Sequence, residues 1–483
     1  MKVLHQLRET AMEQPDAPAL VHNLEPLSYR EFHLAISGMR RSLAARIAPG
    51  RGIAAMLIHD IKTGWIADLA LRSLGLDTVA LQNASDLAAL DGMELKAVIT
   101  AGAEGDHDLT LAGATRDIVV GPDDWADGAF DPVPDTASGG HILLTSATTG
   151  RPKLIMIDTQ AEQADRHSPA QLYASIPGLL PVEDGRGVAN LLGFGLWTAI
   201  GYSPPIRTWG RGGAIITHQG PDAARSLDVP GITHLVAIPA YLAWLLSGQA
   251  GAVRYNERLQ LLVGGGALSA ALFARAKEQL TPHVATLLGS SETGIWALTP
   301  IATDEDLRWH RIHPDRVLEV VDDDHRPLPP GQLGRIRLRQ DNGVTGYLND
   351  PVATAEFFFD DCFYPGDLGV LDGRGRLALS GRITDLLNWQ GQKIPAAPLE
   401  EALQRALGLE GVCALSEVGP GAGEELHVVL ETSAPLDQAT LREAARAHIA
   451  GFTAVQFHFM PVLPRNHMGK IERLKLKRQL AGG

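Results

Sequence analysis

Cysteine is scarce in this chain. Its 483 residues include two cysteines, Cys362 and Cys413, which lie far apart in the sequence. This number excludes the disulfide scaffold of a small secreted protein and is typical of a reducing cytoplasm. The close spacings of Cys and His that mark a zinc site are also missing from the sequence. We therefore expect a cytoplasmic protein without structural zinc.

Positive charge is also in short supply. The chain has 42 Lys and Arg residues against 56 Asp and Glu residues, which gives a formal net charge of −14. Because a nucleic-acid partner requires clustered positive charge, this balance argues against one. A hydrophobic content of 45% and a charged content of 20% are ordinary for a globular protein. A chain of this length is expected to form roughly two or three domains.

Long apolar runs are rare. Residues 1–6 lack the apolar core of a signal peptide. Residues 187–206 carry no charge, and a stretch of this length could cross a bilayer. However, Asn190, Tyr202 and the pair Pro204-Pro205 would make a poor membrane helix. We therefore expect this stretch to be a buried core segment and the protein to have no membrane span.

Apolar patterns predict an α/β fold over most of the chain. Ser28 and Glu31 have the spacing of a capping box, and apolar residues then recur at helical spacing. Strand patterns alternate with helical patterns, and they occur at residues 53–58, 78–81, 233–238 and 259–263. This alternation predicts parallel sheets with crossover helices.

The pattern changes near residue 382. Beyond it, the sequence predicts a helix from Pro398, a strand at residues 426–430, a helix at 437–449 and a strand at 455–459. About 100 residues of this kind are enough for a small α+β domain with its own core. We therefore expect two domains, residues 1–382 and residues 383–483.

A loop rich in hydroxyl groups follows the apolar run at residues 142–144. It reads Thr145-Ser146-Ala147-Thr148-Thr149-Gly150-Arg151-Pro152-Lys153. Its hydroxyls, its glycine and its lysine are the groups that a polyphosphate needs. It is not a Walker A loop, whose glycine and lysine spacing differs. Taken alone, the segment could also be an ordinary turn rich in Thr, Ser and Gly.

Three further positions have a functional and a structural interpretation. Gly264-Gly265-Gly266 ends a predicted strand, which would permit the close approach of a flat ligand or form a tight turn. Asp367 follows Pro365-Gly366, and its carboxylate could accept two hydrogen bonds, although Asp is common in such turns. Lys470, near the C-terminus, would usually be a solvated charge.

The order of these motifs resembles that of the acyl-adenylate-forming, or AMP-binding, enzymes. This superfamily includes acyl-CoA synthetases, peptide-synthetase adenylation domains and luciferases. Besides the loop at residues 145–153, the matching motifs are Leu288-Gly289-Ser290-Ser291-Glu292, Tyr364-Pro365-Gly366-Asp367, the stretch from Gly381-Arg382 to Glu400, and Leu463-Pro464-Arg465-Asn466-His467-Met468-Gly469-Lys470-Ile471. The resemblance covers essentially the whole chain.

The resemblance implies ATP and Mg²⁺ as cofactors, with coenzyme A as the expected acyl acceptor. The nucleotide-binding residues that it implies are Thr145, Ser146, Thr148, Thr149, Gly150 and Lys153 at the phosphates, Gly264, Gly265, Gly266, Leu288 and Gly289 at the adenine, and Asp367 and Arg382 at the ribose. Lys470 would bridge the attacking carboxylate and the α-phosphate. Ser291 would touch the α-phosphate, and Glu292 would hold the magnesium ion.

The resemblance also implies a mobile C-terminal domain. It would swing about a hinge at residues 382–384, presenting Lys470 for adenylation and a face near residues 391–393 for the second half-reaction. Three positions depart from the family's pattern, namely Ala147 for a glycine, Leu288 for an aromatic residue and Thr384 for an Asp or Lys. The basic residues Arg473, Lys475, Lys477 and Arg478 are interpreted most simply as a solvated face.

The acid-binding pocket is expected near residues 190–197. Its candidate lining residues are Asn190, Leu192, Phe194 and Trp197, with Trp296 as a further possibility, although all of them could be ordinary core. The sequence has no acidic residue where amino-acid-activating members hold the substrate ammonium. It also has no histidine in the region where many acyl- and aryl-CoA ligases carry one. We therefore expect an apolar or aromatic acid without a free α-amine.

Alternatives remain for the acyl acceptor. After adenylation with release of pyrophosphate, the acyl group would pass to a thiol, most simply that of coenzyme A. The phosphopantetheine of a carrier protein acting in trans, or an amine, as in an amide synthetase, would also fit. A catalytically silent nucleotide-binding protein on the same fold is the alternative of another class. The presence of Lys153, Glu292, Asp367 and Lys470 argues against it.

Overall fold

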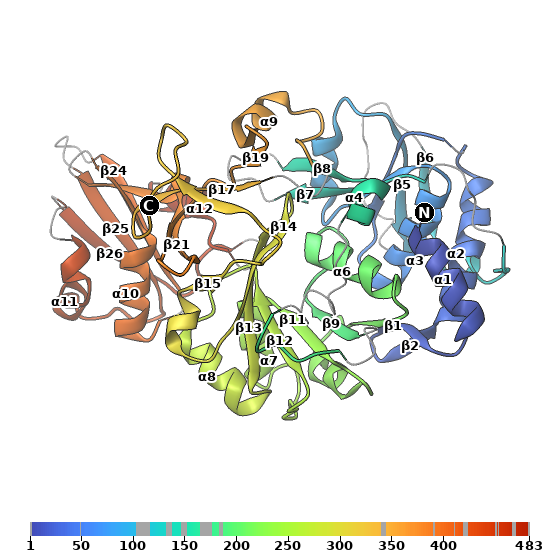
Figure 1. The fold of residues 1–483 in the computed structure, drawn as a ribbon, viewed down its shortest axis with the longest axis horizontal. Coiled ribbons are helices and arrows are strands. Elements are labelled where there is room, and N and C mark those ends of the chain that lie inside the picture. The colour runs from blue at the N-terminus through green and yellow to red at the C-terminus, as the bar shows by residue number, and fades with distance from the viewer. Residues whose placement is uncertain are drawn as a thin grey trace. The chain divides into compact units, whose positions relative to one another are not determined.

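A computed structural model shows how the chain folds. It describes residues 2–48, 50–102, 116–131, 138–145, 152–164, 176–182, 187–339, 344–389, 392–409, 411–418, 424–449, 452, 454–465 and 470–481. The chain forms two compact units (Figure 1). Unit 1 consists of Met1–Gly264, Ala271–Ile301 and Gln340–Asp361, and unit 2 consists of Gly265–Ala270, Ala302–Arg339 and Cys362–Gly483. The predicted boundary between residues 382 and 383 remains a prediction.

Unit 1 contains an 8-stranded sheet with the order β14-β13-β12-β11-β9-β10-β1-β2. Its strands are β1 (Pro18–His22), β2 (Glu25–Ser28), β9 (Val188–Leu192), β10 (Ala214–Thr217), β11 (His234–Ala237), β12 (Gln260–Gly264), β13 (His283–Ser290) and β14 (Gly294–Pro300). Neighbours from β13 to β1 pair in parallel, and the edge strands β14 and β2 are antiparallel. The sheet therefore has the predicted parallel character.

A second, 6-stranded sheet of unit 1 has the order β6-β5-β3-β4-β7-β8. Its strands are β3 (Ile53–Leu57), β4 (Asp77–Ala80), β5 (Leu95–Ala101), β6 (Arg116–Val120), β7 (His141–Thr145) and β8 (Lys153–Ile157). All pairs are parallel except β7 with β8, which is antiparallel. This exception matters for the site, because the hydroxyl-rich loop joins these two strands.

Helices connect the strands of unit 1. They are α1 (Lys2–Glu13), α2 (Tyr29–Ala44), α3 (Ile61–Ser73), α4 (Thr159–Ala164), α6 (Ala199–Trp209), α7 (Pro239–Leu246), α8 (Ala270–Gln279) and α9 (Pro351–Phe357), with the 3-10 turns η1 (Ala84–Leu90), η3 (Pro122–Asp124) and η4 (Ala223–Asp228) and the short strand β18 (Phe358–Phe359). The predicted capping box is present at the start of α2, where Ser28 and Glu31 exchange hydrogen bonds. Phe32, Ile36 and Met39 are buried on this helix, as the helical spacing predicts.

The uncharged stretch at residues 187–206 divides between two elements. β9 occupies its first part and α6 its last part, and most of its residues, including Asn190 and Tyr202, are buried. Within the described part of the chain, no helix is long and apolar enough to cross a membrane. The stretch is therefore core, as expected.

Unit 2 contains an antiparallel sheet that the apolar patterns did not predict. Its strands are β15 (His310–Arg311), β16 (Leu318–Val321), β17 (Leu333–Arg339), β19 (Cys362–Phe363), β20 (Asp367–Leu371) and β21 (Arg376–Arg382), and η5 (Asp304–Leu307) precedes them. They pair in the order β15-β21-β20-β17-β19, with β16 also on β17. β20 begins at Asp367 and β21 ends at Arg382, which places two predicted site residues on neighbouring strands.

The C-terminal part of unit 2 contains the two predicted helices and the two predicted strands, together with further elements that were not predicted. Its elements are η6 (Ile383–Asp385), β22 (Leu386–Trp389), β23 (Gln392–Pro395), α10 (Ala397–Leu407), β24 (Val412–Val418), β25 (Glu424–Glu431), α11 (Gln438–Ile449), β26 (Ala454–Met460) and α12 (Arg473–Ala481). β22 pairs with β23, and β25 lies between antiparallel β24 and parallel β26. Figure 1 shows α10 and α11 beside these three strands.

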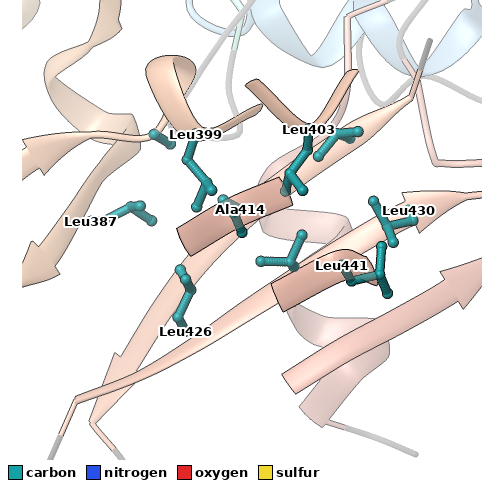
Figure 2. Packing of buried hydrophobic residues seen from close by; sticks show 11 residues of the cluster. Leu387, Leu399, Leu403, Ala414, Leu426, Leu430 and Leu441 are labelled. Carbon is teal, nitrogen blue, oxygen red and sulfur yellow. The ribbon is translucent and has the colours of Figure 1, made fainter. Parts of the chain in front are cut away.

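Two apolar clusters hold this part together. Figure 2 shows Leu399 and Leu403 of α10 and Leu441 of α11 packed against Ala414 and Leu426 of the sheet. A second cluster joins alternate sheet residues to α12, and its buried members are Cys413, Val429, Leu463 and Leu476. Successive side chains of a strand point to opposite faces of the sheet. The cluster with α10 and α11 therefore covers one face, and the cluster with α12 covers the other. Packing of α12 fixes the chain just after Lys470.

Candidate active site

The predicted phosphate loop is the connection between β7 and β8. Thr145 ends β7 and Lys153 begins β8, and these two residues are paired in the antiparallel register. Thr145 is buried. The predicted ligands Ser146, Thr148, Thr149 and Gly150, and the departure at Ala147, lie outside the described residues.

Lys153 lies against two aromatic rings of unit 1. Its Nζ is 3.4 Å from the centroid of the Phe357 ring and 5.0 Å from the centroid of the Tyr347 ring. At these distances a lysine cation is attracted to the face of an aromatic ring. The rings therefore fix the position of the lysine charge at the start of β8.

Glu292 lies in the turn between β13 and β14 and is buried, with 8% of its surface exposed. The Tyr347 hydroxyl donates a hydrogen bond to Glu292 Oε1 at 2.8 Å. Burial and the charge of Glu292 raise the pKa of Tyr347, so the phenol keeps its proton and remains a donor. Tyr347 thus connects the predicted phosphate lysine with the predicted metal ligand.

Glu292 suits a magnesium ion. Mg²⁺ prefers hard oxygen ligands and is commonly held by one or two carboxylates together with substrate phosphates. In the described part of the chain, no three His, Cys, Asp or Glu side chains form a metal-binding group. Glu292 offers one carboxylate of this kind, held by the hydrogen bond from Tyr347.

The neighbours of Glu292 are ordered by short contacts. Thr293 is buried, and its hydroxyl lies 3.0 Å from Ser290 Oγ and accepts a hydrogen bond from Trp296 Nε1 at 2.6 Å. Gly289 packs so closely on β14 that a Cβ there would lie 2.5 Å from the carbonyl oxygen of Gly294. Leu288 and Ser291 are partly exposed on either side. The motif therefore contains a closely packed backbone position, at Gly289, and partly exposed side chains, at Leu288 and Ser291.

The glycine triplet ends β12, as predicted. Gly264 is the last residue of the strand and is buried against Leu287, whose side chain would be 2.4 Å from a Cβ at this position. Gly265 has a φ of 81°, a conformation that favours glycine. Gly266 follows and is exposed. Both interpretations of the triplet remain open, because the glycines serve packing and also leave exposed backbone.

The predicted acid-pocket residues lie in and after β9. Asn190 and Leu192 are buried on the strand, and Phe194 is buried just beyond it. Asn190 Nδ2 donates to Ser226 Oγ at 2.7 Å, whereas its Oδ1 has no partner among the described residues. Trp197 is partly exposed and meets His59 edge-to-face at 6.3 Å. Their role in binding the acid remains a prediction.

A buried charged cluster lies beside this segment and was not predicted. His141 Nδ1 is 2.9 Å from Asp68 Oδ1, and its Nε2 is 3.1 Å from the carbonyl oxygen of Leu196, next to Trp197. Burial opposes the ionisation of Asp68, but His141 and Arg72 outweigh it and lower the pKa of this carboxyl. The cluster therefore anchors the segment that precedes Trp197 to β7 and α3. The sequence spacing of Asp68 and Arg72 could not have revealed it, since His141 lies 73 residues away from Asp68.

Unit 2 brings together three predicted residues. Asp367 and Arg382 are register partners on β20 and β21, with 3.4 Å between Arg382 Nε and Asp367 Oδ1. Burial raises the pKa of Asp367, while the charges of Arg382 and Lys470 act in the opposite direction. Lys470 is exposed and lies near enough to Asp367 to act on it. The charge of the predicted catalytic lysine thus acts to lower the pKa of the predicted ribose carboxylate.

One sequence interpretation is wrong. Arg473 was grouped with a solvated basic face, but its side chain is 20% exposed and binds both oxygens of Glu400, at 2.7 and 2.8 Å. The reason is that Arg473 begins α12 beside the buried Glu400 of α10. Lys475, Lys477 and Arg478 are exposed, as expected.

Comparison with protein families finds one match that covers most of the chain. The family model described as AMP-binding enzyme matches residues 7–348. Among curated proteins, the salicylyl-CoA synthase / salicylate adenylyltransferase of a Streptomyces species is 27% identical over 370 residues, which cover 72% of this chain and 64% of that protein. The 4-chlorobenzoate–CoA ligase of an Arthrobacter species is 26% identical over 508 residues, covering 98% and 94%.

A third relative matches over a shorter region. The sulfoacetate–CoA ligase of Cupriavidus necator is 35% identical over 161 residues, which are 32% of each protein. The chain thus spans slightly less than two thirds of the salicylyl-CoA synthase and one third of the sulfoacetate–CoA ligase.

Solved structures share the fold along nearly the whole chain. The o-succinylbenzoate CoA synthetase of Bacillus subtilis, in complex with its acyl-adenylate intermediate, has a TM-score of 0.81 and 21% identity, covering 98% of this chain and 97% of that one. The amide bond synthetase of Marinactinospora thermotolerans has a TM-score of 0.80 and 20% identity, covering 99% of both chains. These similarities confirm the predicted fold class.

Proposed function

The chain belongs to the family of AMP-binding enzymes, and on that premise we propose that it activates a carboxylic acid with ATP and passes the acyl group to coenzyme A. In the first step a carboxylate oxygen attacks the α-phosphorus of ATP, the bond to the β-phosphate breaks, and pyrophosphate leaves. In the second step the thiol sulfur bonds to the acyl carbon, and AMP leaves with the oxygen it gained. The proton of the thiol is released.

One observation carries the proposal, the joint placement of Lys153, Tyr347 and Glu292 in unit 1. A cation at the start of β8 and a buried carboxylate at the β13–β14 turn meet at one phenol. Lys153 would neutralise the leaving pyrophosphate, and Glu292 would hold Mg²⁺. The magnesium ion would withdraw charge from the phosphate oxygens. Because a polyphosphate and its metal ion would contact both groups, their shared contact with Tyr347 supports the proposal.

Unit 2 supplies the second group of residues. Asp367 would accept the ribose hydroxyls, with Arg382 beside it. Lys470 would stabilise the charge that develops as the carboxylate meets the α-phosphate, since a fixed cation there acts mainly on the transition state. The exposure of Lys470 supports this role, because the cation is accessible to substrate.

The substrate we propose is an apolar or aromatic acid without a free α-amine. Two relatives that match well over half of this chain are named for salicylate and 4-chlorobenzoate, both aryl acids. The predicted pocket segment is apolar and aromatic, with Leu192, Phe194 and Trp197 after one another in the chain. A pocket lined by such side chains would favour a flat apolar acid over an amino acid, because the ammonium group of the amino acid would lose its hydration there.

Two other acceptors have support from relatives. The fatty acid–[acyl-carrier-protein] ligase ScoC of Streptomyces coeruleorubidus is 28% identical over 73% of this chain, which favours a carrier protein. The amide bond synthetase noted above favours an amine. Coenzyme A is preferred because the salicylyl-CoA synthase and the 4-chlorobenzoate–CoA ligase are both named for it.

The test is acid-dependent ATP–pyrophosphate exchange with magnesium present. The panel would contain salicylate, 4-chlorobenzoate, a medium-chain fatty acid and phenylalanine. We expect exchange with at least one aryl or apolar acid and none with phenylalanine. Coenzyme A, a phosphopantetheinylated carrier protein or an amine would then be added to the active acid. Binding of ATP without exchange for any acid would instead favour a silent nucleotide-binding protein.

A further inference from the structure

Backbone pairing joins the chain before Lys470, at Pro464 and Arg465, to the chain after it, at Ile471 and Glu472. Arg465 and Ile471 form an isolated antiparallel bridge. The N–H of Glu472 donates to the carbonyl oxygen of Pro464 at 2.8 Å. The two ends of the segment that carries Lys470 are therefore joined directly beside this lysine.

One end of this segment is fixed by Glu431, the last residue of β25. Arg465 Nη2 lies 2.6 Å from Glu431 Oε2, and Glu431 Oε1 accepts the N–H of Leu463 at 2.9 Å. A charged hydrogen bond of this length is among the strong ones. The chain that enters the segment is thus held to the sheet.

The other end is fixed by Arg473, three residues after Lys470. Its Nη2 contacts both oxygens of Glu400, and its Nη1 donates to the carbonyl oxygen of Ala414 at 2.9 Å. Glu400 Oε1 also accepts the N–H of Ala414 at 2.7 Å. The guanidinium is therefore locked to α10 and β24, which belong to the core in Figure 2.

The Nε side of the same guanidinium lies beside the end of the predicted hinge. Arg473 Nε lies 3.2 Å from Oδ2 of Asp385, the last residue of η6. The hinge that the family resemblance implies, residues 382–384, lies directly before Asp385. Asp385 and Lys470 also act on the same carboxylate, that of Asp367. One arginine thus connects the end of the hinge with the segment of Lys470.

We propose that Arg473 is a positioning residue that couples the hinge to Lys470 through Asp385. Its contacts with Glu400 and Ala414 hold the segment after Lys470 to the C-terminal core, and its contact with Asp385 holds the last hinge residue to the same group. Any rotation at the hinge is then confined to the residues before Asp385. Lys470 would follow that rotation, because Arg473 ties the chain after it to Glu400 and Ala414. The inference rests on the proposed function, which gives Lys470 its role in adenylation.

The choice of Asp385 as the position to change follows from the contacts. Asp385→Ala removes the hinge contact but none of the groups through which Arg473 contacts Glu400 and Ala414, so we expect the variant to fold. Arg473→Lys is the second variant, since one ammonium cannot hold Glu400 and Asp385 in the same way. The matched control is Asp372→Ala, which removes another contact between an Asp and an arginine Nε, at 2.7 Å, in the turn between β20 and β21.

The experiment measures ATP–pyrophosphate exchange for each variant, alone and combined with Lys470→Ala. Enough enzyme is used that one tenth of the Lys470→Ala activity can be measured. We expect Asp385→Ala to lower kcat about 10- to 100-fold with the KM for ATP within about twofold, since small misplacements cost this much. In the Lys470→Ala background it should have no further effect, because it acts through Lys470. Arg473→Lys should behave in the same way, and Asp372→Ala should match the wild type.

Three results separate the possible failures. A further loss of about tenfold in the Lys470→Ala background overturns the coupling, because the effect then does not pass through Lys470. Activity of Asp385→Ala within about twofold of the Asp372→Ala control overturns it as well. Absence of exchange in the wild-type protein with every acid would instead count against the proposed function. Thermal unfolding of each variant confirms that the folded protein is compared.

Discussion

The hydrogen bond from Tyr347 to Glu292 permits a direct test of the site in unit 1. Tyr347→Phe removes the hydroxyl and keeps the ring, so the contact of that ring with Lys153 at 5.0 Å is retained. The lost bond is 2.8 Å long, ends on a carboxylate and is buried. Hydrogen bonds to charged groups contribute about 1.5–3 kcal/mol. Because about 1.4 kcal/mol is a factor of ten, kcat/KM should fall about 10- to 150-fold.

The assay is ATP–pyrophosphate exchange as a function of magnesium concentration. The variant should need more magnesium for half-maximal rate, since Glu292 loses the donor that orients it. Tyr29→Phe is the matched control, because Tyr29 is buried and donates at 2.7 Å to a neutral carbonyl, that of Gly213. If Tyr347→Phe, like Tyr29→Phe, shares the magnesium dependence of the wild type, the Tyr347 hydroxyl does not orient Glu292 for the metal ion.

Three further predictions follow from other parts of the structure. Lys470→Ala should lower adenylation about 10²–10³-fold in the exchange assay, and exchange within a few-fold of wild type would remove Lys470 from the catalytic role. Gly289→Ala should lower the free energy of unfolding in urea by about 1–3 kcal/mol, because its Cβ would meet the carbonyl oxygen of Gly294 at 2.5 Å; an unchanged midpoint would contradict this. Burial lowers the pKa of His234 from 6.5 to about 4, so the unfolded chain binds more protons between these values and stability falls as the pH drops. His234→Asn should reduce the loss between pH 6.5 and 5 by about 2 kcal/mol in urea titrations, and equal losses in both proteins would be inconsistent with a neutral buried imidazole.

Local patterns were enough for much of the fold. The capping box at Ser28 and the apolar spacing after it predict α2 because both depend on neighbours within a few turns. The same holds for the C-terminal part, where the predicted strand at residues 455–459 packs Val455, Phe457 and Phe459 on one side of the core. The family predicted from the motifs is confirmed, since the model for AMP-binding enzymes matches residues 7–348.

The antiparallel sheet of unit 2 was missed, although part of its signal was present. Residues 335–338 alternate Arg and an apolar residue, and Ile336 and Leu338 are buried on β17. This period of two predicts a strand with one buried face. The short strands β15 and β19 have only two residues each, too few for any periodicity. Their pairing depends on contacts that are distant in the sequence.

The contacts that give the site its geometry could not be read from the sequence. Tyr347 and Phe357 reach Lys153 only because the β7–β8 hairpin and α9 lie side by side in unit 1. In the sequence Arg473 looks like the exposed basic residues that follow it. Only the folded structure, which places Glu400 of α10 beside it, shows that Arg473 forms an ion pair. Motifs predict which residues react, whereas the partners that orient those residues depend on tertiary packing.

The transfer of an oxygen atom tests the central claim most directly. The acid that supports exchange is labelled with ¹⁸O in its carboxylate and incubated with ATP, magnesium and the acceptor, and the AMP is analysed by mass spectrometry. An acyl-adenylate route predicts one ¹⁸O atom in the phosphate of AMP, because the carboxylate oxygen that attacks the α-phosphorus leaves with AMP. Unlabelled AMP, or ADP as the nucleotide product, would contradict the account.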